Sequence, residues 1–178
     1  VRTSIIIPTR DRSEMCREAI ESALRLAGAN RREVIVVDDG STDTTPDVLA
    51  GFGDRIRVIR KEGVGRGAAR NAGLAVARGR LVAFIDDDDA YFPDGLQQLE
   101  ETLESSSEEV GVVYGRPRYV RRDPTNPLLS RTAGGLGSEG WVLPQMVGAN
   151  FVVMGNVVAR LDAVRQVGGF NPDLPLAQ

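Results

Sequence analysis

Histidine is absent from this sequence of 178 residues, so an imidazole cannot serve here as a general base or a metal ligand. A general base would have to be a carboxylate or another group with a displaced pKa. Cysteine occurs once, at Cys16, which excludes an internal disulfide bond and is typical of a reducing compartment. Cys16 falls among apolar residues at helical spacing, and we expect it in the core.

Lysine is almost absent too, because Lys61 is the only lysine among 22 basic residues. The net charge of −3 gives no indication of a nucleic acid partner. No apolar run approaches the ~20 residues that span a bilayer, and we expect no secretory leader. With 42% hydrophobic residues, a chain of this length can form one well-buried domain.

Strand and helix signals alternate along the first two thirds of the chain. Short apolar runs predict strands, and apolar residues at helical spacing predict helices between them. The predicted strands cover residues 4–7, 34–37, 56–59, 81–85 and 110–114, and the predicted helices cover 13–27 and 68–77 and begin at 45 and 93. Strands that are apolar throughout and alternate with helices indicate an α/β fold with a mostly parallel sheet flanked by helices.

The last third of the chain is less regular. Its glycine-rich residues 132–140 predict a loop. Trp141, which follows this loop, is either a partly buried core residue or an aromatic platform for a ligand. Residues 151–154 and 157–159 predict two more strands, and 161–167 predict a short helix.

Two of the predicted strands end in acidic residues. Asp38 and Asp39 follow one strand, and four consecutive aspartates at 86–89 follow another. Ligands of open α/β sheets bind at the carboxyl ends of the strands, so these acids, together with Pro8 and Thr9, should meet at one edge. Crowded carboxylates raise one another's pKa unless a cation lies among them, and their oxygens suit Mg²⁺ or Mn²⁺. The acids therefore predict a metal-assisted site for a phosphorylated ligand.

Five motifs occur in order along the chain. They are Ile7-Pro8-Thr9-Arg10-Asp11-Arg12, Val37-Asp38-Asp39-Gly40-Ser41-Thr42-Asp43, Gly67-Ala68-Ala69-Arg70-Asn71-Ala72-Gly73, Phe84-Ile85-Asp86-Asp87-Asp88-Asp89 with Pro93, and Val167-Gly168-Gly169-Phe170. Together they resemble the motifs of family 2 glycosyltransferases, inverting enzymes with GT-A, the Rossmann-like fold of nucleotide-diphospho-sugar transferases. The resemblance implies a single GT-A domain over residues 1–178. It also implies transfer of a sugar, with inversion, from a nucleotide-sugar to an acceptor hydroxyl, with a UDP-sugar as the expected donor.

The resemblance implies roles for individual residues as well. The four aspartates resemble the family's Asp-x-Asp motif, whose last acid, here Asp88, binds the Mn²⁺ or Mg²⁺ that bridges the donor diphosphate. The first acid of the motif contacts the ribose or sugar. The residues expected to bind the nucleotide-sugar are Pro8, Thr9, Asp11, Asp39, Arg70, Asp86 and Asp87. Asp11 stands where the family more usually has asparagine.

The expected catalytic base is missing from the sequence. The family carries its base in an acidic pair shortly after Gly-Gly-Phe, which corresponds here to Gly168-Gly169-Phe170. The sequence stops at Gln178, at about that point, so we expect a chain cut short before its base, which would lie beyond Gln178. Asp173 is a less suitable candidate within the sequence.

Two other functions stay open on the residues alone. A sugar-phosphate nucleotidyltransferase shares the acidic metal site, but normally has a glycine-rich loop with Arg and Lys where this chain has Pro8-Thr9-Arg10-Asp11. A non-catalytic nucleotide-sugar-binding domain is consistent with the missing base.

The expected partners are a nucleotide-sugar donor and a glycan, lipid-linked or small-molecule acceptor, as in polysaccharide biosynthesis, with no nucleic acid. The expected location is the cytoplasm, and regions outside this sequence could attach the protein to the inner face of the membrane.

Overall fold

The computed structural model describes residues 1–27, 32–92, 94–116, 118–120, 130–132, 140 and 154–173. The strands of its main sheet are β1 (Thr3–Thr9), β2 (Arg32–Asp38), β3 (Arg57–Arg60), β4 (Leu81–Phe84), β5 (Val112–Tyr114) and β8 (Val157–Arg160). The helices are α1 (Ser13–Ala27), α2 (Thr45–Ala50), α3 (Arg66–Val76), α4 (Gly95–Ser105) and α6 (Leu161–Gln166), with 3-10 turns η1 (Gly53–Arg55) and η2 (Met154–Asn156). A separate antiparallel pair consists of β6 (Arg118–Val120) and β7 (Ser130–Thr132).

The main sheet has the strand order β3-β2-β1-β4-β8-β5. Strand β1 is parallel to β2 and β4, and β3 is parallel to β2, whereas β8 is antiparallel to both of its neighbours. The predicted mostly parallel sheet is therefore confirmed. The register pairs Thr9 with Asp38, so the carboxyl ends of β1 and β2 lie side by side.

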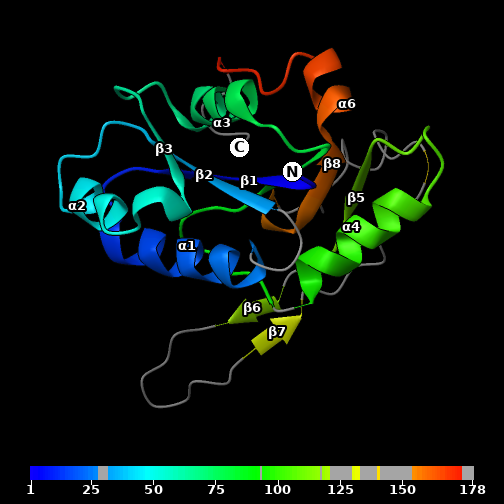
Figure 1. Cartoon of the computed structure of the whole chain (residues 1–178), viewed down its shortest axis with the longest axis horizontal. Coiled ribbons are helices and arrows are strands. Elements are labelled where there is room, and N and C mark those ends of the chain that lie inside the picture. The colour runs from blue at the N-terminus through cyan, green and yellow to red at the C-terminus, as the bar shows by residue number, and fades with distance from the viewer. Residues whose placement is uncertain are drawn as a thin grey trace.

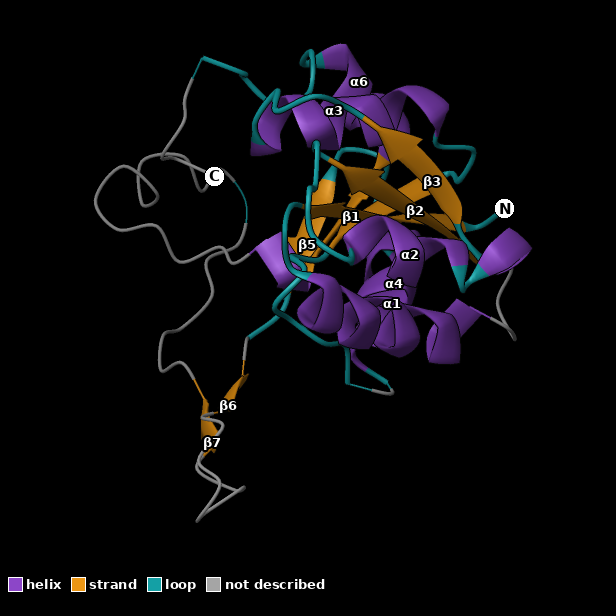
Figure 2. Ribbon diagram, turned by 90° about the vertical axis from the view of Figure 1, so that its left-hand side faces the viewer, coloured by secondary structure: helices purple, strands orange, loops and turns teal. Residues whose placement is uncertain are grey.

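Helices cover both faces of this sheet, with α3 and α6 on one face and α1, α2 and α4 on the other (Figures 1 and 2). Successive residues of a strand point to opposite faces, and the core divides accordingly. Ile5 and Ile7 pack in the cluster that contains Cys16, while Ile6 packs in the cluster that contains Leu74. Cys16 is fully buried, as expected. Among the described residues, no helix is long and apolar enough to cross a bilayer.

Three expectations about the secondary-structure elements need correction. Strand β1 continues through Pro8 instead of stopping there; because β4 pairs with β1 only as far as Ile6, one side of β1 has no ladder at Pro8. The strand expected at 110–114 is not buried, because β5 lies at the sheet edge and Val112 is 48% exposed. Met154, expected in a strand, begins a 3-10 turn.

Several predicted features lie outside the described residues. These are Pro93 at the expected helix start, most of the loop at 132–140, Trp141, residues 151–153 and Gln178.

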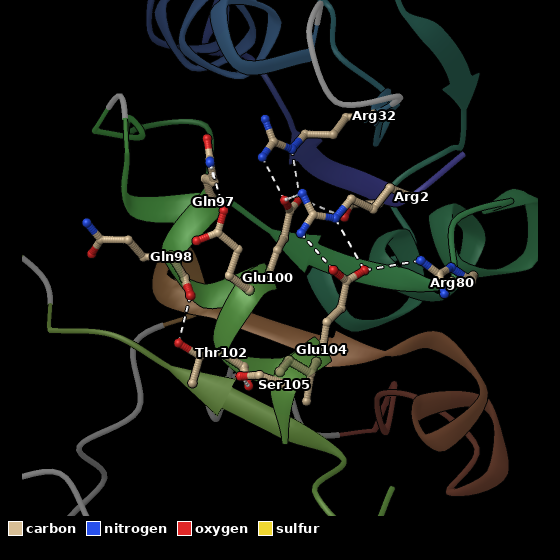
Figure 3. Close-up of polar contacts among 12 residues, drawn as sticks. Arg2, Arg32, Arg80, Gln97, Gln98, Glu100, Thr102, Glu104 and Ser105 are labelled. Carbon is tan, nitrogen blue, oxygen red and sulfur yellow. Dashed lines mark hydrogen bonds and ion pairs between the residues drawn. The ribbon is translucent and has the colours of Figure 1, made fainter. Parts of the chain in front are cut away.

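An ion-pair network at the amino ends of the parallel strands holds α4 against the sheet (Figure 3). Glu100 on α4 is fully buried and receives two bonds from Arg32, Nε at 2.7 Å and Nη2 at 2.6 Å. Thr3 Oγ1 donates to Glu100 at 2.7 Å, and Arg2 Nη1 lies 2.9 Å from it. Glu104, one turn further along α4, pairs with Arg2 nearer the surface. The buried carboxylate thus has donors from the starts of both β1 and β2.

Candidate functional site

Four aspartates follow β4 at the carboxyl edge of the sheet. The chain turns here, and Asp89 N–H donates to Asp86 O at 3.1 Å. The turn brings carboxylate oxygens of Asp86, Asp88 and Asp89 within 4.8 Å of one another. One divalent cation with oxygen ligands is of a size to contact all three groups, so these residues fit Mg²⁺ or Mn²⁺.

Partial burial of the carboxyl group and the crowding of these acids raise the pKa of Asp89. Its carboxyl group is packed close to the backbone, since a Cβ built on Gly155 would lie 2.7 Å from Asp89 Oδ2. Although Asp89 as a residue is exposed, partial removal of its carboxyl group from water, reinforced by the charges of Asp86 and Asp88, raises the pKa of Asp89 to about 6. A cation among these groups would relieve that repulsion.

Asp87 points away from this group and into the protein. It is 7% exposed, accepts a hydrogen bond from Thr9 Oγ1 at 2.8 Å, and has a pKa raised mainly by burial. Arg12, just before α1, bridges two of the acids, with Nη1 at 3.0 Å from Asp87 Oδ1 and at 3.0 Å from Asp88 Oδ2. The structure therefore ties the acidic turn to the end of β1.

Asp39, at the end of β2, is enclosed by the loop that precedes α3. The residue is 6% exposed, and its carboxylate accepts N–H bonds from Val64 at 2.7 Å and Gly65 at 2.9 Å. Asp39 N–H in turn donates to Thr9 O at 2.9 Å. The glycine-rich loop thus directs these two amide groups at a carboxylate of the protein, which argues against a phosphate-binding loop there.

Arg70 lies on α3, on the sheet face opposite α1, and its side chain reaches the acidic turn at the sheet edge. Its side chain is fully buried, and Nη2 lies 2.6 Å from Asp86 Oδ1. The guanidinium carbon lies 5.4 Å from the ring centroid of Phe170. Within the described part of the chain, Arg70 Nε and Nη1 have no hydrogen-bond partner. A buried guanidinium with two unpaired donors is a costly group to retain.

Asp11 faces a neighbouring turn rather than the acids after β4. Its backbone has φ 52°, which aspartate tolerates better than most residues, and its N–H donates to Ser41 Oγ at 2.9 Å. Its carboxylate accepts N–H bonds from Thr42 at 2.6 Å and Asp43 at 3.2 Å, and the Thr42 bond lowers its pKa. Asp11 therefore stabilises the turn that follows Asp39.

The structure brings the predicted site residues Pro8, Thr9, Asp39, Arg70 and the acids of residues 86–89 to one edge. The candidate base Asp173 is exposed, and its N–H donates to Asn171 Oδ1 at 2.9 Å. Sequence reasoning assigned no role to Arg12 or Asp89. The signals were present, because Arg12 ends the first motif and Asp89 is the fourth acid in the run.

Comparison with solved structures defines the class of fold. TarS of S. aureus, solved as residues 1–349 with UDP-GlcNAc, superposes with a TM-score of 0.72 at 19% identity, over 96% of this chain and 48% of that one. The mannosyltransferase PcManGT of Pyrobaculum calidifontis, solved with GDP-Man and Mn²⁺, gives a TM-score of 0.69 at 20% identity, over 97% of this chain and 48% of that one. The protein has the GT-A fold of such glycosyltransferases, as its motifs predicted.

The sequence then identifies the family. The chain belongs to glycosyl transferase family 2, whose sequence profile matches residues 4–161. The succinoglycan biosynthesis protein ExoO of Rhizobium meliloti is 44% identical over 96 residues, which are 53% of this chain and 27% of ExoO. The chain spans between 18% and 35% of the length of three Rickettsia glycosyltransferases that it also matches.

Proposed function

We propose that this chain forms a single glycosyltransferase domain over residues 1–178 that binds a nucleotide-sugar through a divalent cation. The observation that carries the proposal is the group formed by Asp86, Asp88 and Asp89, whose oxygens lie within 4.8 Å of one another. This group lies at the same sheet edge as the enclosed carboxylate of Asp39, where ligands of such sheets bind. Membership of the family makes the donor, rather than an unrelated phosphate, the natural ligand.

Asp88 is the proposed principal ligand of Mn²⁺ or Mg²⁺, because it stands as the last acid of the stretch that resembles Asp-x-Asp and its carboxylate belongs to the group of three. Asp86 and Asp89 are close enough to complete or stabilise the site. When bound, the cation offsets the negative charge that develops on the leaving nucleoside diphosphate. The Mn²⁺ bound by PcManGT, which shares the fold, supports this choice of cofactor.

The remaining site residues are proposed to bind or frame the nucleotide-sugar. Asp39, beside the end of β1 with Pro8 and Thr9, is proposed to accept hydrogen bonds from the base or ribose, since each carboxylate oxygen can accept more than one. Arg70 offers two unpaired N–H groups. The buried Asp87, through Thr9 and Arg12, and Asp11, through the turn after Asp39, are proposed to hold the site's shape.

We propose a UDP-sugar as donor and a glycan, lipid-linked or small-molecule acceptor, in a cytoplasmic protein that works at the inner face of the membrane. The UDP-GlcNAc bound by TarS supports the uridine nucleotide, and ExoO's place in succinoglycan biosynthesis supports a polysaccharide role. The intact protein would transfer the sugar with inversion, as an acceptor hydroxyl deprotonated by a carboxylate attacks the anomeric carbon. That carboxylate is proposed to lie beyond Gln178, because Asp173 is exposed and has no described contact with the acidic turn.

The test is a calorimetric titration of UDP into the chain with Mn²⁺ and then with EDTA, with GDP as the competing nucleotide. We expect UDP to bind only with Mn²⁺, and GDP to bind more weakly. Asp88→Asn should abolish Mn²⁺-dependent binding while leaving the fold intact, because it relieves repulsion among the acids.

A matched control is Asp54→Asn, which makes the same change at an exposed position in η1. Asp54 precedes β3, so it lies towards the amino ends of the parallel strands, whereas the acidic turn lies at their carboxyl ends. This variant should bind UDP like the unaltered chain. Unchanged UDP affinity in Asp88→Asn would remove the metal assignment, and tighter binding of GDP than of UDP would replace the proposed donor by a guanosine one.

A further inference from the structure

Asn71 on α3 holds the chain that follows α6. Its Nδ2 donates to Phe170 O at 2.7 Å, and Phe170 N–H donates to its Oδ1 at 2.8 Å. Gly169 has φ +74°, and a Cβ built there would lie 2.5 Å from Asn71 Oδ1, so a side chain at this position would prevent the pairing. The two hydrogen bonds therefore fix the point from which the chain continues beyond Phe170.

The Phe170 ring connects this pairing to the acidic turn. It packs edge-on against Phe84, the last residue of β4, with the ring centroids 5.1 Å apart and the planes at 85°. On another side lies the guanidinium of Arg70, which pairs with Asp86 at 2.6 Å. A continuous series of contacts thus runs from Asp86 through Arg70 and Phe170 to Asn71.

Arg70 makes this series sensitive to what happens at Asp86. The guanidinium is fully buried, and its described partners are one carboxylate and the aromatic ring. A buried charge held by so few groups depends strongly on each of them. A change at Asp86 should therefore alter how Arg70 packs against Phe170, since a dense interior transmits such shifts.

We propose that Asn71 is a positioning residue, and that Asp86, Arg70 and Phe170 couple donor binding to the placement of the segment after Phe170. The inference rests on the proposed function, because it takes Asp86 as part of the donor site. The resemblance to the family expects the catalytic base shortly after this segment. Donor binding and orientation of the base would then depend on one set of contacts.

The coupling can be tested without any ligand, by hydrogen exchange in a peptide covering residues 168–173. Asp86→Asn removes the charge that pairs with Arg70, and should speed exchange in this peptide. Asp88→Asn removes a neighbouring charge that has no described contact with Arg70, and should leave exchange there unchanged. Equal exchange in the two variants would overturn the coupling.

The positioning role is tested by UDP affinity in the presence of Mn²⁺. Asn71→Ala should weaken UDP binding about tenfold, because Phe170 no longer supports Arg70. Arg165→Ala is the control, since Arg165 Nη2 ties α6 to α3 through Leu74 O at 2.7 Å and Ala77 O at 3.0 Å and has no described bond to Phe170 or Asn71. It should leave affinity within about twofold.

Asn71→Asp covers the case in which the alanine variant fails to fold, because it keeps the shape of the side chain and the acceptor for Phe170 N–H. It replaces the donor by a charged oxygen that repels Phe170 O, so it should also weaken UDP binding. UDP affinity equal to that of Arg165→Ala in both Asn71 variants would overturn the positioning role. If the unaltered chain binds no UDP, the proposed function fails, while the exchange comparison still decides the coupling.

Discussion

Replacement of Glu100 should destabilise the protein far more than replacement of Glu104, although both acids lie on α4 and both pair with arginine. Glu100→Ala leaves Arg32, whose side chain is 1% exposed, without its carboxylate partner. Breaking a buried ion pair by removing one member costs about 3–5 kcal/mol. Glu100 also accepts bonds from Thr3 and Arg2, so its loss leaves further donors unpaired.

Glu104→Ala supplies the comparison. The side chain of Glu104 is 32% exposed, and its partners Arg2 and Arg80 are 19% and 79% exposed, so solvent reaches both of its ion pairs. Pairs of this kind contribute about 0–1 kcal/mol. The expected difference between the two variants is therefore about 3 kcal/mol in the free energy of unfolding.

The assay is equilibrium unfolding in urea, followed by circular dichroism, on the unaltered chain and both variants. The double variant Arg32→Met/Glu100→Leu should recover most of the loss, because it removes the unpaired buried charge as well. A loss below about 1 kcal/mol in Glu100→Ala, or equal losses in the two single variants, would refute this account of the network.

Three further predictions concern other parts of the molecule. Gly79→Ala should lower the free energy of unfolding in urea by about 1–3 kcal/mol, because its Cβ would lie 2.6 Å from the Ser4 backbone nitrogen. In the control Gly95→Ala, the new Cβ makes only an ordinary contact at 3.8 Å, so stability should not fall. Burial raises the pKa of Cys16 to about 12, so the native thiol should resist alkylation by iodoacetamide until the chain unfolds, and rapid labelling would contradict its burial. Asp89, with its pKa raised from 3.8 to about 6, is mostly protonated near pH 5. Because its ionisation is harder in the folded state, the metal-free chain should lose stability as pH rises from about 4 to about 6, and Mn²⁺ affinity should rise as Asp89 ionises near pH 6. A Mn²⁺ titration at about pH 5 and pH 7.5 checks this, and Asp89→Asn should reduce the pH dependence.

Much of the fold could be predicted from the sequence, because its elements have simple local signals. Helix α1 begins at Ser13 and ends at Ala27, as the apolar spacing predicted. The continuous apolar runs of β1 and β2 identified strands buried on both faces. Position within the sheet has no such signal, so β5 looked like a buried strand although it lies at an edge.

The candidate site was predictable in its location but not in its internal contacts. Four identical acids in a row do not reveal that Asp87 turns inward to Thr9 while Asp88 stays exposed, since that depends on the turn geometry. The bridge from Arg12 to these acids joins residues 75 and 76 positions apart, which no local pattern encodes. The contact between Asn71 and Phe170 joins residues 99 positions apart, further still.

The ion-pair network of Glu100 and the acidic turn lie at opposite ends of the same strands, which has a practical consequence for engineering. Strand β1 has seven residues, so the two ends are separated by about 20 Å. Substitutions at that separation generally have additive effects. Improvements at the amino end could raise the tolerance of the protein to mutation without altering the chemistry of the other end. A library that varies the carboxyl end for new donors could therefore start from a variant stabilised at the amino end.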